Sequence, residues 1–178
     1  MSDVTASGSI TASEMTFSQA VKDYSSSSQA NYEVEVSFWW NDLYFFGAFK
    51  DKVITAWGGN LTQYPDENNV YYYEQKNDWG SYDRTTKASY VESVINGGGY
   101  YQFPQTVSSS AKARSGRFIY DLIQNGKEGK TTKVITQYAH QMLTGSTSIS
   151  ISVNGPSVSV VPGSGYDTST QLFNYITY

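Results

Sequence analysis

Flat aromatic rings gather with amide and carboxylate side chains in four segments of this sequence. The segments run from Trp57 to Asn60, from Tyr71 to Tyr73, from Asn77 to Gly80 and from Tyr100 to Tyr101. A flat ring can cover the apolar C–H face of a sugar, while amide and carboxylate oxygens bond the sugar hydroxyl groups. The competing interpretation is that the rings pack in the core or in cross-strand pairs. This must be true of most of them. The predicted glycan-binding residues are Trp57, Asn60, Tyr71, Tyr73, Asn77, Asp78 and Trp79.

The sequence offers few groups for catalysis or metal binding. His140 is the only histidine, and no cysteine is present. A Ser-His-Asp triad depends on geometry rather than on residue order, so His140 stays open as a triad member, but an ordinary strand histidine is the favoured interpretation. Loop oxygens between Pro65 and Asn69 lack the spacing of an EF-hand calcium loop. We therefore expect a protein that is not an enzyme, with no cofactor and no metal.

Composition restricts the class of partner. The chain has 178 residues, a net charge of −4, and only 16% charged residues. Negative net charge argues against nucleic acid, although the segment from Lys112 to Lys133 is locally basic. The solvent-facing surface must rely on Ser, Thr, Asn, Gln and Tyr. Such a surface suits hydroxyl-rich or peptide partners better than strongly charged ones.

The element that must position these side chains is the stretch from Tyr32 to Trp57, in which apolar residues recur at every second position. This period is typical of strands. A two-residue turn at Asn41-Asp42 predicts a hairpin with one wholly apolar side. The predicted cross-strand partners are Trp40 and Leu43, Phe38 and Phe45, Val36 and Gly47, Val34 and Phe49, and Glu33 and Lys50.

Two helices are predicted from caps and helical spacing. Thr11 to Glu14 matches a capping box, and an apolar stripe follows at three- and four-residue spacing, which predicts a helix over about 12–24. A second helix is expected over about 86–95. The run from Asn96 to Gly99 would stop it, because asparagine and glycine accept the left-handed backbone at a helix end.

A regular alternation of serine with isoleucine or valine follows from Ser146 to Val160. It predicts a hairpin that pairs Ile151 with Val158 and Ile149 with Val160, with serine opposite serine on the other side. Pro156 cannot donate the hydrogen bond that closes a two-residue turn. We therefore expect a four-residue loop from Val153 to Pro156.

Together these segments predict a mainly β fold. We expect a single domain over 1–178, folded as an antiparallel β-sandwich or closed β-barrel of about 10–12 short strands with one or two short helices. Turn signals about every ten residues favour these architectures.

Three functions from different classes remain open. A non-catalytic, lectin-like protein that binds a glycan is the first. The alternative is a membrane-acting or pore-forming β protein, suggested by the hairpin from Thr144 to Val161, although Pro162 leaves its second arm short of the 9–11 residues of a membrane strand. The third is a self-assembling structural protein, because tyrosines and unpaired strand edges favour contacts between copies.

The compartment stays open as well. The first residues, Met1 to Met15, lack the basic start and apolar core of a secretory signal, and no apolar run is long enough for a membrane-spanning helix. The sequence as written therefore predicts a cytoplasmic protein, unless a signal was removed or export is non-classical.

Overall fold

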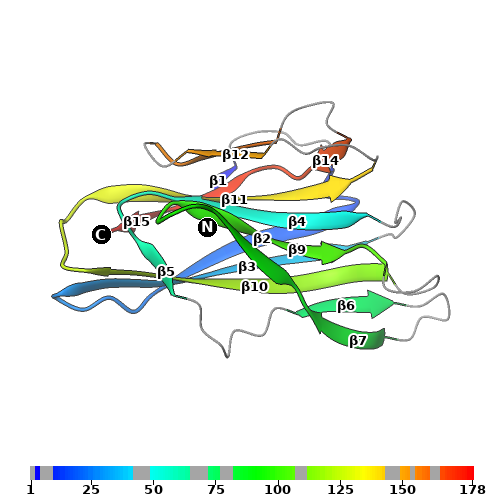
Figure 1. Cartoon of the computed structure of the whole chain (residues 1–178), viewed down its shortest axis with the longest axis horizontal. Coiled ribbons are helices and arrows are strands. Elements are labelled where there is room, and N and C mark those ends of the chain that lie inside the picture. The colour runs from blue at the N-terminus through cyan, green and yellow to red at the C-terminus, as the bar shows by residue number, and fades with distance from the viewer. Residues whose placement is uncertain are drawn as a thin grey trace.

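The computed structural model describes residues 3–4, 10–41, 49–64, 72–76, 82–106, 112–142, 149–152, 155–160 and 165–178. In these residues the regular structure is all β, in antiparallel sheets that pack together as a sandwich (Figure 1). The prediction of a mainly β antiparallel fold is confirmed, and of the two architectures the sandwich fits and the closed barrel does not.

Three sheets make up the described structure. The first, here called the β4 sheet, contains in spatial order β1 (Asp3–Val4), β15 (Leu172–Thr177), β11 (Thr131–Gln141), β4 (Lys50–Trp57), β9 (Gly98–Pro104) and β8 (Ser89–Val94), with β14 (Tyr166–Thr168) paired to β11. The second, the β3 sheet, contains β2 (Met15–Asp23), β3 (Gln29–Trp40), β10 (Lys112–Asn125), β6 (Tyr72–Lys76) and β7 (Tyr82–Lys87), with β5 (Thr62–Tyr64) paired to β10. The third is the outer hairpin of β12 (Ile149–Ser152) and β13 (Ser157–Val160).

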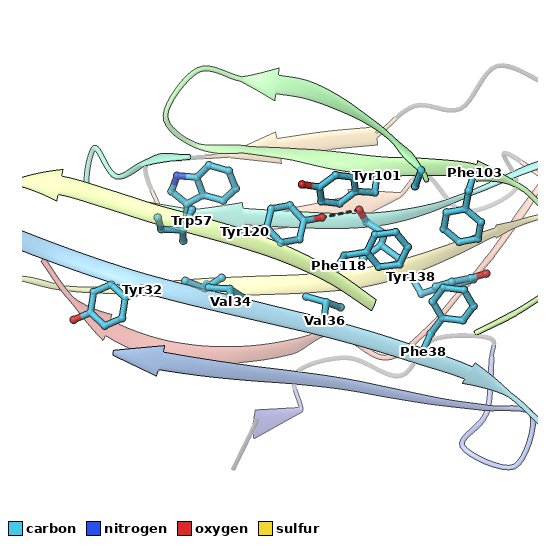
Figure 2. Close-up of a cluster of buried hydrophobic side chains, with 14 of the residues drawn as sticks. Tyr32, Val34, Val36, Phe38, Trp57, Tyr101, Phe103, Phe118, Tyr120 and Tyr138 are labelled. Atoms are coloured by element: carbon cyan, nitrogen blue, oxygen red, sulfur yellow. Dashed lines mark hydrogen bonds between the residues drawn. The ribbon is translucent and has the colours of Figure 1, made fainter. Parts of the chain in front are cut away.

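The main core lies between the two large sheets and is rich in aromatic rings (Figure 2). Every second residue of β3 points into it, including Val34 and Phe38, because side chains alternate across a strand. The Phe38 ring stacks on Phe103 of the opposite sheet with centroids 5.4 Å apart. Gly116 lies directly opposite Phe38 on β10, where a Cβ atom would overlap that ring. Glycine at this position is what leaves room for the stack.

The predicted pairing of residues 33–40 with residues 43–50 is wrong, because both edges of β3 pair with other strands, although the predicted apolar face of β3 is right. β3 pairs with β2 and β10, so Glu33 lies opposite Lys22 and Asp121 rather than opposite Lys50. β4 belongs to the other sheet and pairs with β9 and β11. The predicted turn was at Asn41-Asp42, and residues 42–48 lie outside the described part of the chain. Two-fold periodicity fixes which side chains point inward, but the partner strand depends on segments far along the chain.

The helix predicted over 12–24 is also wrong, because these residues form β2. One contact of the capping box forms: the Thr11 backbone N–H donates to Glu14 Oε2 over 2.7 Å. The Thr11 hydroxyl group donates to the same carboxylate instead of accepting from a backbone N–H, and the Met15 N–H donates to the Thr11 carbonyl. These bonds close a single turn, and the chain then enters the strand. Pairing of the whole of β2 with β3 outweighs the local preference, since helical propensity is only a weak prior.

The second predicted helix, over 86–95, is replaced by the end of β7 and all of β8. These strands belong to different sheets, and Ala88 between them is buried. The apolar spacing read as one helix face therefore comes from a strand that changes sheet. No helix occurs in the described residues.

The pairing predicted for the serine-rich hairpin is confirmed. Ile149 lies opposite Val160 and Ile151 opposite Val158, with serine opposite serine between them. Residues 153–154 lie outside the described part of the chain, so the four-residue loop stays a prediction.

The outer hairpin covers the side of the β4 sheet that faces away from the main core (Figure 1). Its isoleucines and valines pack on a second apolar cluster, formed by Ile54, Ala56, Ile135, Ala139 and Phe173. A Cβ atom on Gly98 would crowd a methyl group of Ile151, so this glycine seats the hairpin closely. Gln171 Nε2 donates to the Val158 carbonyl over 2.6 Å. The four serines of the hairpin face solvent.

Candidate functional site

A buried polar cluster surrounds the carboxylate of Asp51 in the main core. Gln105 Nε2 donates to it over 2.6 Å, the Gln141 backbone N–H over 3.1 Å, and the Tyr138 hydroxyl group donates to its other oxygen. His140 Nδ1 lies 3.0 Å from both carboxylate oxygens. A buried carboxylate needs such partners, because an unpaired charge away from water is very unfavourable.

This cluster ties the two large sheets together. Trp40 of the β3 sheet donates through Nε1 to the Tyr138 hydroxyl group over 3.1 Å. Burial, and then the nearby Asp51 carboxylate, raise the pKa of Tyr138, so that its hydroxyl group stays protonated and donates to Asp51. Asp51 and His140 are both buried, which gives a substrate no access to them. The geometry supports a structural role for His140 rather than membership of a triad.

An open hollow of about 730 Å³ lies at the end of the outer hairpin, on the outer side of the β4 sheet. Ligand sites commonly have volumes of roughly 300–1,000 Å³. The start of β11, the end of β15, the loop after β4 and the turn of the outer hairpin surround it. We call it the end hollow, and its lining residues are Gly59, Asn60, Thr131, Thr132, Lys133, Gly155, Pro156, Tyr175 and Tyr178.

The loop after β4 is fixed by a buried tryptophan. Trp57 Nε1 donates to the Leu61 carbonyl over 2.7 Å, which closes the loop. Gly59 and Asn60 within it have φ of 82° and 55°, the left-handed region that glycine and asparagine accept best. The Tyr178 ring lies where a Cβ atom of Gly59 would be. The loop thus holds the exposed Asn60 at the edge of the end hollow.

Tyr175 is the most exposed ring in the end hollow, with 58% of its surface accessible. It meets the Phe173 ring edge-on, with centroids 5.6 Å apart and an interplanar angle of 90°. Lys133, directly opposite Tyr175 on β11, places Nζ 5.5 Å from the Tyr175 centroid and 4.8 Å from the Phe173 centroid. Cation–π and edge contacts of this kind restrict the orientation of the ring.

The structure places only one of the predicted glycan-binding residues, Asn60, in the end hollow. Trp57 is 1% exposed and packs against Tyr120, so its ring supports the loop from inside and cannot lie against a sugar. Tyr73 belongs to β6, but its side chain is outside the described part. The other four, Tyr71, Asn77, Asp78 and Trp79, lie outside the described residues.

Sequence reasoning missed Tyr175, Tyr178 and Lys133. The alternation from Leu172 to Thr177 already places Tyr175 on the same strand face as Phe173. Nothing local shows that Lys133 lies beside it, because that contact depends on the pairing of β11 with β15.

Within the described residues no group of three or more His, Asp or Glu side chains is placed to hold a metal ion. The same residues contain no helix of the length and apolarity needed to cross a membrane. No protein-family model matches the sequence, and the search of curated proteins found no similar chain.

Proposed function

We propose that this protein is a non-catalytic, lectin-like carbohydrate-binding protein and that the end hollow is its sugar site. The observation that carries the proposal is the Tyr175 ring, exposed in an open hollow and held in orientation by Phe173 and Lys133. A flat, restrained ring offers apolar area to a sugar face at small cost in conformational entropy.

Polar groups around that ring match the rest of a sugar. Asn60 supplies an amide that can both donate and accept, and Thr131 and Thr132 supply hydroxyl groups. Among the described lining residues, Lys133 is the only one with a charged side chain, and its ammonium group lies over the two rings. This combination favours a neutral sugar with several hydroxyl groups over a strongly charged ligand.

The test is a glycan array, followed by calorimetric titration of the sugars that bind. Tyr175→Ala should weaken binding about tenfold or more, whereas Tyr175→Phe should keep most of the affinity because the ring remains. Tyr24→Ala is the matched control, since Tyr24 is also 58% exposed but does not line the end hollow.

Asn60→Gly tests the amide alone. Glycine adopts the left-handed backbone of Asn60 without strain, so the loop should keep its shape while the hydrogen-bonding group is lost. A three- to tenfold weaker affinity is expected. Absence of any sugar binding at millimolar ligand, or equal affinity of the wild type and Tyr175→Ala, would overturn the proposal.

A second candidate, action on membranes, is favoured by one observation on the outer hairpin. Its two strands form a sheet of their own, and apolar side chains together with the Gln171 hydrogen bond attach it to the β4 sheet. One face carries isoleucine and valine and the other serine, the alternation of a membrane barrel strand.

Dye release from liposomes tests this second candidate. Release by the wild type, faster release by Gln171→Ala, and none by Ile149→Ser with Ile151→Ser would support it, because the first change loosens the hairpin and the second removes its apolar face. Intact vesicles at micromolar wild-type protein would exclude it.

A further inference from the structure

A second hollow, of about 290 Å³, lies on the outer side of the β3 sheet. Strands β2, β3 and β10 form its floor. We call it the sheet hollow, and it is lined by Thr16, Ser18, Ser37, Phe38, Trp39, Ser115, Gly116 and Arg117. No part of the function proposed above uses it.

The hydroxyl groups of the sheet hollow lie on one face of the sheet. Thr16 pairs with Trp39 across β2 and β3, and Ser18 pairs with Ser37 two residues further along β2, on the same face. Neighbouring side chains on such a face are separated by roughly 5 Å across strands and roughly 7 Å along a strand. No hydrogen bond joins the hydroxyl groups of Thr16, Ser18 or Ser37 to another described residue. These groups are free to bond a ligand.

Trp39 lies at one end of this group of hydroxyl side chains, with 38% of its surface exposed. The guanidinium of Arg114 lies over its ring, with Cζ 4.9 Å from the centroid. Arg114 sits where the pairing of β10 with β6 shifts by one residue, between Ala113 and Ser115. A bulge of this kind re-aims a side chain, which is how Arg114 comes to face Trp39.

The two arginines near the sheet hollow differ in their partners. Arg117 Nη2 donates to Glu35 Oε2 over 2.7 Å, and Lys22 pairs with Glu33 over 2.6 Å. These two cations and two anions balance one another. No described carboxylate pairs with Arg114, and its buried Nε has no hydrogen-bond partner. Among the described residues, the cation without a carboxylate partner therefore lies at the Trp39 end of the hollow.

Arg114 is partly exposed although its Nε is buried, so a ligand would pair with the outer N–H groups of its guanidinium, which match two oxygens of a carboxylate or sulfate. We infer that the sheet hollow binds an acidic saccharide, whose carboxylate or sulfate pairs with Arg114. Its ring lies by Trp39, and its hydroxyl groups bond Thr16, Ser18 and Ser37. The volume suits one sugar ring with its charged substituent. This site is separate from the end hollow and holds whether or not the end hollow binds a sugar.

Calorimetric titration of the full-length protein with matched ligands tests the inference. The ligands are a uronic acid oligosaccharide, the same oligosaccharide with its carboxyl groups reduced to alcohols, and a sulfated neutral oligosaccharide. At low ionic strength we expect at least one acidic form to bind tenfold or more tightly than the neutral form, with affinity falling as salt is added. The two acidic arms distinguish carboxylate from sulfate. Equal affinity for acidic and neutral forms would overturn the inference.

Variants locate the site. Arg114→Gln should weaken binding of the acidic saccharide at least tenfold, and Arg114→Lys should restore only part of it, since an ammonium group lacks the planar fork. Lys127→Gln removes an exposed cation elsewhere and should leave affinity within twofold. If Arg114→Gln also stays within twofold, with unchanged circular dichroism, the sheet hollow is not the site. Trp39→Ala provides a second measurement, with a similar loss expected.

Discussion

The two outer faces of the sandwich differ in nearly every respect, although the inner faces share one aromatic core. The outer side of the β4 sheet carries a second apolar cluster, and the outer hairpin covers it. The outer side of the β3 sheet carries hydroxyl groups and ion pairs, and its sheet hollow is open. Isoleucine and phenylalanine on an outer face require a cover, whereas serine and threonine do not.

This difference shows where ligands can reach the protein. The cover stops at Gly155 and Pro156, and the end hollow begins there. The open face needs no cover, and the sheet hollow lies directly on its strands. On each face the candidate site is where polar groups replace apolar ones around a partly exposed ring. Four measurements test whether the two faces differ in this way.

The largest effect is expected where the covered face is truly buried. Ile135 is 5% exposed and lies beneath the outer hairpin. Ile135→Ala should lower the free energy of unfolding by about 2–4 kcal/mol, because the change removes apolar contacts and leaves a cavity. The matched control is Ile95→Ala at a site 78% exposed, which should change the free energy of unfolding by less than about 0.5 kcal/mol. Urea unfolding measures both. Equal effects would mean that the hairpin does not bury this face.

The shared core between the faces should respond to pH through Tyr138. Tyr138→Phe removes a donor to Asp51 and an acceptor from Trp40, and should cost about 1–3 kcal/mol at pH 8. Burial and the Asp51 charge raise the folded-state pKa of Tyr138 above the unfolded value of about 10. Its stabilising contribution is therefore complete below about pH 10 and is lost as pH rises toward the folded-state pKa.

The measurement for Tyr138→Phe is urea unfolding at pH 8 and again above pH 10. The difference between wild type and variant should shrink at the higher pH, since only the wild type has this group to ionise. Tyr24→Phe, at an exposed position, should match the wild type at both values. A difference that grows with pH would contradict the assignment.

A smaller effect is expected from the cover itself. Ile151→Ala on the inward side of the outer hairpin should cost about 1–2 kcal/mol, because this side chain is only partly buried. The variant should also bind more of a dye specific for exposed apolar surface. Ser150→Ala, one residue away on the solvent side, should do neither. If both variants behave alike, the two sides of the hairpin do not differ in their contribution to the free energy of unfolding.

The smallest effect is expected on the open face. Arg117 lowers the pKa of Glu35. Burial of the carboxylate opposes this shift in part, and Lys22 adds to it. The resulting stability is present above the unfolded pKa of about 4.3 and is lost as pH falls through the folded-state value. Glu35→Gln should therefore cost less than about 1 kcal/mol at pH 7, and less still in high salt.

The cost of Glu35→Gln should shrink as pH falls below the unfolded pKa of about 4.3 and disappear below the folded-state pKa, where the wild-type carboxylate is protonated. Glu92→Gln, on the exposed strand β8, is the control and should be neutral at either pH. A cost that persists in acid would point to packing rather than to charge.

Local alternation was enough to predict several features of the fold. The inward face of β3 and the pairing of Ile149 with Val160 follow from a period of two, which the backbone of any strand imposes on its side chains. The same period gave the mainly β class. In the hairpin the partner strand is only a few residues away, so register could be read as well.

The helix predicted over about 12–24 was wrong because two periods compete in this segment. Met15 to Val21 reads as a helix stripe or as alternating strand positions, and the difference rests on Gln19, which a strand places inside. Asn174 donates to Gln19 Oε1 over 2.6 Å, and Gln19 Nε2 lies 3.3 Å from Thr136 Oγ1. A buried amide is tolerated only with such partners, and these come from β15 and β11.

Which residues of a strand face inward could be predicted locally, because it depends on backbone geometry within that strand. The pairing of the strands, the burial of Trp57, and the place of Asn60 in the same hollow as Tyr175 could be seen only in the folded chain. Pairing and exposure are set by contacts between segments far apart in the chain, which no local pattern specifies.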